Sequence, residues 1–164
     1  MKSILLTILL LVSTSAASDS LELASQAEFR ELLESLATAW NEGDADTAAH
    51  CFTPDAVYTE PPQKQVYRGR DELFEFFGGT AGRPGQMAMT WRTMVFDARS
   101  QTGMGEFSFE YGSLVHGVAV ISLKGGLISQ WREYWYESEK PWKEFVQPSD
   151  PDFQQSGPAL DGTH

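Results

Sequence analysis

Residues 103–137 read GMGEFSFEYGSLVHGVAVISLKGGLISQWREYWYE, and this stretch decides the fold class. β-Branched and aromatic residues dominate it, as is typical of strands. Gly112-Ser113 and Gly125-Gly126 interrupt the run, and two-residue turns of this kind connect neighbouring antiparallel strands. With the residues just before it, the stretch predicts an antiparallel sheet of four strands, over residues 86–97, 103–111, 114–124 and 127–137.

The chain before residue 86 has mostly the spacing of helices. Phe29, Leu33, Leu36 and Trp40 share one face of a predicted long amphipathic helix, which ends at Gly43. Because helices precede an antiparallel sheet, we expect an α+β fold. The remaining predicted elements are short helices over residues 45–52, 71–77 and 142–146, and a short strand over residues 56–58.

Hairpin geometry predicts which side chains share a face of the sheet. We assume that Tyr111 pairs with Leu114 and that Lys124 pairs with Leu127, after which side chains alternate between the two faces. One face is then aromatic and apolar, apart from one imidazole and one carboxyl group. It carries Phe107, Phe109, Tyr111, His116, Val118, Val120, Trp131, Glu133 and Trp135.

Glu133 and His116 are the candidate catalytic residues of this face. The register makes them diagonal neighbours, with Cα atoms roughly 7–8 Å apart. A carboxyl group among aromatic rings is costly to ionise, so its pKa rises unless a cation pairs with it, and such groups serve as general acids or bases. A buried Glu–His pair that only fixes the register explains the same pattern equally well.

Large aromatic side chains predict the lining of an apolar ligand pocket, although residues of this kind also form ordinary cores. The glycine-rich stretch over residues 78–85 is either a lid over this pocket or a plain loop. We expect the single cysteine, Cys51, to be buried and inert. The expected pocket residues are Trp40, Tyr58, Trp91, Phe107, Phe109, Val118, Trp131 and Trp135.

The composition excludes several classes of partner. The 164 residues include 12 Lys and Arg against 23 Asp and Glu, a formal net charge of −11, which disfavours nucleic acids and anionic membrane surfaces. The three histidines are scattered, so we predict no metal site. The glycine-rich stretch does not follow a strand, as a phosphate-binding loop does, and we predict no cofactor.

The two ends of the chain differ from its middle. Residues 1–17 carry a basic start, an apolar run and small residues, which predicts a cleaved signal peptide and a secreted or periplasmic protein. The apolar run is far shorter than the roughly 20 residues that span a bilayer. A buried N-terminal helix is the alternative. Residues 18–146 form the predicted domain, and residues 147–164 a disordered tail.

Four short motifs carry a resemblance to the nuclear transport factor 2-like superfamily, and within it to SnoaL-like domains. They are WNEGD at 40–44, FTPDAVY at 52–58, GRDEL at 69–73 and GLISQWREY at 126–134. The resemblance implies a cone-shaped barrel, in which a curved, mostly antiparallel sheet wraps over N-terminal helices. Relatives include polyketide cyclases, ketosteroid isomerases, dehydratases and epoxide hydrolases, as well as proteins that only bind.

Resemblance to limonene epoxide hydrolase-like members places a carboxylate at Glu133. Those enzymes also use an Arg and a second Asp on the neighbouring strand, where this chain has Phe107 and Phe109. Our leading hypothesis is a cofactor-independent isomerase, cyclase or dehydratase that acts on a small apolar molecule by general acid–base catalysis. The alternatives are a binding protein without catalysis, or a dimerising module with a filled cavity whose interface contains Tyr134 and Tyr136. We expect a homodimer.

Overall fold

A computed structural model describes residues 23–147 and places helices and a single six-stranded sheet in that range. The predicted signal peptide, and the predicted tail apart from Gln147, lie outside the described residues. The helices are α1 (Gln26–Glu42), α2 (Ala45–His50), α3 (Gly69–Phe76) and α4 (Trp142–Phe145), with short 3₁₀ turns at η1 (Pro61–Gln63) and η2 (Gly79–Ala81). The strands are β1 (Phe52–Glu60), β2 (Gln65–Arg68), β3 (Ala88–Asp97), β4 (Thr102–Tyr111), β5 (Ser113–Lys124) and β6 (Leu127–Glu137).

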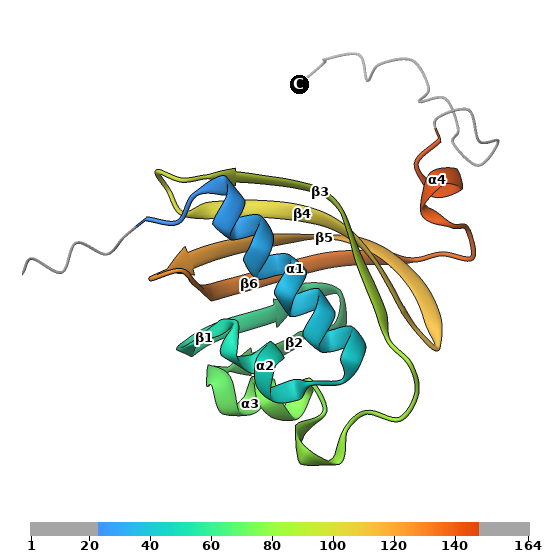
Figure 1. Ribbon diagram of the computed structural model, residues 1–164. Coiled ribbons are helices and arrows are strands. Elements are labelled where there is room, and N and C mark those ends of the chain that lie inside the picture. Colours follow the sequence, from blue (N-terminus) through green and yellow to red (C-terminus); the bar gives the residue numbers. More distant parts are fainter. Residues whose placement is uncertain (1–22, 148–164) are drawn as a thin grey trace, which may run out of the picture.

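The strands lie in the order β2-β1-β6-β5-β4-β3. All neighbours are antiparallel except β1 and β6, which run parallel. Figure 1 shows the curved sheet bending around α1, with α2 and α3 packed below it and α4 beyond the far end of β6. The predicted α+β class, with a curved and mostly antiparallel sheet over N-terminal helices, is therefore confirmed.

Helix α1 begins and ends where the sequence signals indicate. Ser25 and Glu28 form a reciprocal capping box at its start, and Gly43 closes it in the left-handed conformation, with a φ of 72°. Its buried face lies against the sheet. The Asn41 side chain bonds the backbone N–H and C=O of Met89, which ties the end of α1 to β3.

Glycines on the inner face of the sheet make room for aromatic rings. A Cβ atom at Gly103 would lie 2.6 Å from the Phe29 ring, and one at Gly105 would lie 2.6 Å from the Trp91 ring. Such contacts are too close for any real side chain. The rings therefore lie directly on bare backbone, which lets the sheet curve closely around α1.

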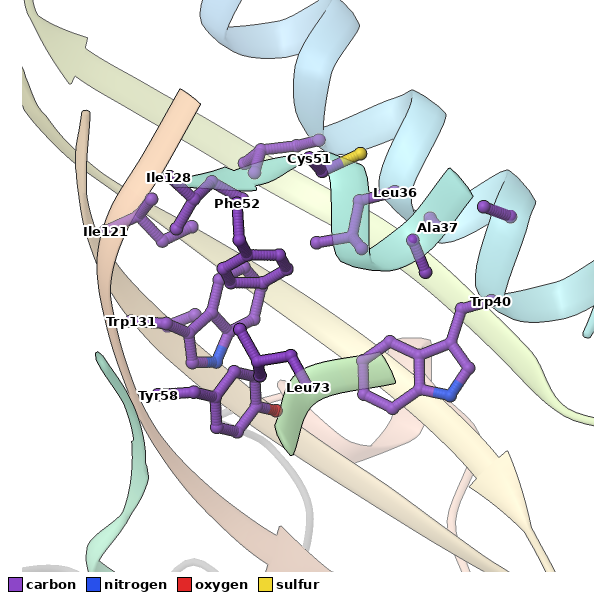
Figure 2. Packing of buried hydrophobic residues seen from close by; sticks show 14 of the residues in the cluster. Leu36, Ala37, Trp40, Cys51, Phe52, Tyr58, Leu73, Ile121, Ile128 and Trp131 are labelled. Atoms are coloured by element: carbon purple, nitrogen blue, oxygen red, sulfur yellow. The ribbon is translucent and has the colours of Figure 1, made fainter. Parts of the chain in front are cut away.

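The core continues across β1 and β6. The rings of Tyr58 and Trp131 stack, with centroids 5.4 Å apart and planes 8° from parallel. Figure 2 shows these two rings together beside Phe52 and Leu73, with Trp40 lying apart from them below α1. All of these except Trp40 are essentially inaccessible to solvent, and Trp40 is only 6% exposed.

The register of β5 differs from the predicted one. Tyr111 pairs with Ser113 rather than with Leu114, which leaves a tight turn around Gly112. Lys124 pairs with Leu127 as predicted, but a bulge then shifts the register beyond Ser122. Each change displaces the pairing by one residue and therefore turns β5 over relative to its neighbours.

The two displacements cancel between β4 and β6. Phe107 and Phe109 on β4 and Trp131, Glu133 and Trp135 on β6 therefore share the inner face as predicted. His116, Val118 and Val120 on β5 lie on the outer face instead, because their partners on β6 are Tyr136, Tyr134 and Arg132.

Candidate functional site

A cavity of about 270 Å³ lies between the inner face of the sheet and the helices, slightly below the roughly 300–1,000 Å³ typical of ligand pockets. Five predicted site residues line it: Glu133, Trp40, Phe107, Phe109 and Trp135. The other lining residues are not among the predicted pocket residues. These are Glu60, Gln63, Gln65, Phe76, Arg83, Met89, Tyr111, Ser113 and Val115.

Three predicted pocket residues belong to the supporting core instead of the lining. Tyr58 and Trp131 form the buried stack beneath the cavity. Trp91 packs edge-on against Trp131, at 5.9 Å between centroids, and its indole N–H donates to the Leu33 carbonyl at 2.8 Å. They shape the pocket without forming its surface.

His116 does not meet Glu133, and its predicted place in the pocket is wrong, as is that of Val118. Both errors follow from the turned register of β5. The His116 ring is buried on the outer face, where Phe145 of α4 lies 4.6 Å away between centroids. Its Nε2 atom is 2.8 Å from the Lys140 carbonyl and its Nδ1 atom is 3.0 Å from Ser108 Oγ. Because a carbonyl oxygen can only accept, Nε2 donates its proton to Lys140.

Glu133 is the buried carboxyl group of the cavity. Its side chain is on β6, and the residue is only 7% exposed. The Trp131 indole N–H donates to Glu133 Oε2 at 2.9 Å. Burial and the negative charge of Glu60 raise the pKa of Glu133 to about 8, against the lowering effect of hydrogen bonds from Trp131 and Tyr58. Glu133 is therefore mostly protonated at neutral pH.

Glu60 is a second buried carboxyl group in the same cavity. The parallel pairs Tyr58–Trp131 and Thr59–Arg132 place it beside Glu133 at the next step along β1 and β6. Burial raises the pKa of Glu60, and the positive charge of Arg83 opposes that rise. The alternation Ala56-Tyr58-Glu60 is the signal that could have revealed it, had the predicted strand been extended beyond Tyr58.

The Tyr58 hydroxyl is a third buried polar group near the carboxyl groups of Glu133 and Glu60. Burial and the carboxyl groups of Glu133 and Glu60 raise the pKa of Tyr58 well above its ordinary value, so the phenol stays protonated. Its proton can point toward the Glu133 carboxyl group, whose ionised form it favours, although the described residues give this hydroxyl no hydrogen bond of ordinary geometry.

The site holds two carboxyl groups, and the charge of Glu60 disfavours ionisation of Glu133. Because two adjacent carboxylates do not ionise independently, the pair titrates as a unit. A protonated Glu133 can donate, while an ionised Glu60 can accept. Within residues 23–147, no group of three or more His, Cys, Asp or Glu side chains is arranged to hold a metal ion.

Cys51 is buried in the core, as predicted. It is 6% exposed, and its Sγ atom lies 3.5 Å from the Thr47 carbonyl. Burial raises the pKa of the thiol to about 11, which leaves little thiolate at neutral pH.

In the described part of the chain, no helix is both long and apolar enough to span a membrane.

Comparison with known proteins agrees with this architecture. The model of the SnoaL-like domain family matches residues 33–131. The chain belongs to this family. The matched region runs from α1 to the middle of β6, so it contains Glu60 and Trp131 and ends two residues before Glu133. A search of curated proteins finds no match to the chain.

Solved structures share the nuclear transport factor 2-like fold at low sequence identity. A protein of unknown function from Burkholderia xenovorans is 22% identical, with a TM-score of 0.59 over 80% of this chain and 97% of that one. SalBIII, an epoxide hydrolase/cyclase-like enzyme of pyran ring formation in salinomycin, is 20% identical, with a TM-score of 0.59 over 68% and 93%. An epoxide hydrolase from M. tuberculosis is 18% identical, with a TM-score of 0.56 over 68% and 84%. At these identities the likeness shows the fold alone.

Proposed function

We propose that this SnoaL-like protein is a cofactor-independent enzyme that transfers protons on a small, largely apolar molecule. The observation that carries the proposal is the pairing of Glu133, with a pKa of about 8, with Glu60 inside one aromatic cavity. An isomerisation, a cyclisation or a dehydration needs an acid and a base held near the same bound molecule.

The two carboxyl groups have different parts in this proposal. Protonated Glu133 donates to an oxygen of the ligand as negative charge develops there. Ionised Glu60 accepts a proton from carbon or from water. The Tyr58 hydroxyl lies beside Glu133 in the core and favours the ionised form that Glu133 takes after it has donated its proton. Rings of Trp40, Phe107 and other lining residues hold the apolar part of the ligand and exclude water.

In other proteins the same fold carries an epoxide hydrolase and an epoxide hydrolase/cyclase-like enzyme. In this chain the neighbouring-strand positions hold Phe107 and Phe109, so a second acid and an arginine cannot come from there. Glu60 on β1 and Arg83 before β3 line the same cavity from other elements. Proton transfer at an oxygen is therefore the part of that chemistry that we propose for this chain.

A binding protein without catalysis is the second candidate. The aromatic wall favours it, because apolar burial supplies affinity for a ligand without any chemistry. In that case the two glutamates set only the affinity for a polar group and its pH dependence.

Two wider expectations remain proposals. The basic and apolar start of the chain supports export by a signal peptide. A homodimer through the outer face of the sheet is supported by four exposed apolar residues there. They are Val95, Met104, Tyr134 and Tyr136.

The test of the proposed function incubates a mixed metabolite extract with wild type, Glu133→Gln, Glu60→Gln and the control Glu106→Gln, and follows it by mass spectrometry. Glu106 is exposed, and it pairs with Val118 of the outer face. We expect wild type and the control to consume a metabolite that Glu133→Gln converts roughly 10²–10⁴-fold more slowly. Equal consumption by Glu133→Gln contradicts the enzyme assignment. A metabolite that stays bound and unconverted in every variant supports the binding protein.

A further inference from the structure

The segment between α3 and β3, residues 78–87, contributes Arg83 to the lining of the cavity. It is rich in glycines of positive φ, among them Gly78 at 124°, Gly82 at 71° and Gly85 at 96°. Other residues adopt these conformations only with strain, so the path of the segment depends on its glycines. Its central side chain, Arg83, is half-buried.

Arg83 is fastened to the body of the protein by its guanidinium group. Nε donates to the Phe76 carbonyl at 2.8 Å, and Nη2 donates to the same oxygen. The guanidinium carbon lies 4.9 Å from the centre of the Phe76 ring and 5.8 Å from that of Tyr111. The Tyr111 hydroxyl in turn donates to the Pro84 carbonyl at 2.8 Å. These contacts hold the segment against the ends of α3 and β4.

Arg83 separates the cavity from the surface. It lines the inner cavity together with Glu60 and Glu133, and it also lines a shallow hollow on the outside between Tyr67 and Glu75. Among the described residues it makes no ion pair within 4.0 Å with either glutamate. Its charge therefore acts on Glu60 from a distance: it lowers the pKa of Glu60 and partly offsets the larger rise caused by burial.

We propose that Arg83 is a positioning residue: it is held at the cavity wall by segment 78–87, and its charge favours the ionised form of Glu60 and thereby favours the proton on Glu133. This inference rests on the proposed function, since it assigns the base and the acid of that site. If the segment opens, the guanidinium group moves away from Glu60. The pKa of Glu60 then rises, and the preference of the proton for Glu133 becomes smaller. The closed segment therefore both lines the pocket and favours the protonated form of Glu133.

The test follows the glutamate carboxyl carbons by carbon-13 NMR as a function of pH, with Glu60→Gln and Glu133→Gln to assign the pair. In Arg83→Gln we expect the lower apparent pKa of the pair to rise. Arg83→Lys keeps the charge and should stay closer to wild type. Arg99→Gln, an exposed residue in the turn after β3, is the matched control and should change nothing. An unchanged titration in a folded Arg83→Gln protein overturns the proposal.

A second variant separates the segment from the charge. Tyr111→Phe removes the hydrogen bond to Pro84 and keeps both the ring and Arg83. We expect faster amide hydrogen exchange over residues 78–87, together with a smaller rise in the same apparent pKa. Faster exchange with an unchanged titration contradicts the link between closure and charge. Neither measurement involves turnover, so these results test only the role of Arg83. The proposed function is tested separately, and it fails if Glu133→Gln still converts the metabolite.

Discussion

Glu60 and Glu133 occupy neighbouring positions on the parallel strands β1 and β6, and both line one cavity. Each is less than a tenth exposed. Placing two carboxyl groups together out of water is unfavourable when both are ionised, so the arrangement retains a proton at neutral pH. This proton is the one that Glu133 can donate to a bound molecule.

Replacing Glu60 tests the coupling within the pair. Glu60→Gln removes the nearby negative charge, one of the two causes that raise the pKa of Glu133. We expect the pKa of Glu133 to fall, while burial still keeps it above the ordinary glutamate value of 4.5. Carbon-13 NMR of the Glu133 carboxyl measures this, and a pKa equal to that of wild type would show that the two groups do not interact.

The stability of the protein should depend on pH through Glu133. The folded protein holds this proton up to about pH 8, whereas the unfolded chain releases it near pH 4.5, the ordinary pKa of a glutamate. The contribution of Glu133 is therefore fully present below about pH 4.5 and is lost as the pH rises toward 8. Between these values the wild type should lose roughly 1 kcal/mol of unfolding free energy per pH unit relative to Glu133→Gln. Urea unfolding of both proteins at several pH values measures the difference, and parallel curves would contradict it.

His116 should act as a structural residue. His116→Ala removes a buried ring that contacts Ser108 and the Lys140 carbonyl, so we expect a loss of about 1–3 kcal/mol and a loosened α4. Turnover per folded molecule should stay at the wild-type level. Thermal unfolding and activity per folded protein measure the two effects, and His50→Ala, at an exposed position of α2, serves as the control. Lost turnover in a stable His116→Ala protein would restore His116 to the catalytic site.

Much of the fold could be predicted from local patterns. The face of α1, its end at Gly43 and the four strands of the C-terminal half follow from periodicity and turn residues that act over a few positions. β2 has no such signal, because three of its four residues are exposed and it is a short edge strand. The pairing of β1 with β6 joins residues more than 70 positions apart, and no turn specifies it.

The candidate site shows the same division. Alternation along a single strand is enough to predict that Trp131, Glu133 and Trp135 share one face of the sheet. His116 was misplaced because its face depended on the turn at Gly112 and on a bulge near Ser122, and each shifts the register by one residue. Glu60 and Arg83 reach the cavity through long-range packing, which short-range patterns do not describe.

The most direct test of the account is the pKa of Glu133 in the wild-type protein. Carbon-13 NMR of the glutamate carboxyl groups, with Glu133→Gln to assign the signal, should show one carboxyl that titrates at about 8. That result would establish a protonated acid in the cavity at neutral pH. A Glu133 that titrates near 4.5, like an ordinary surface glutamate, would contradict the account, because no proton would then be available for transfer.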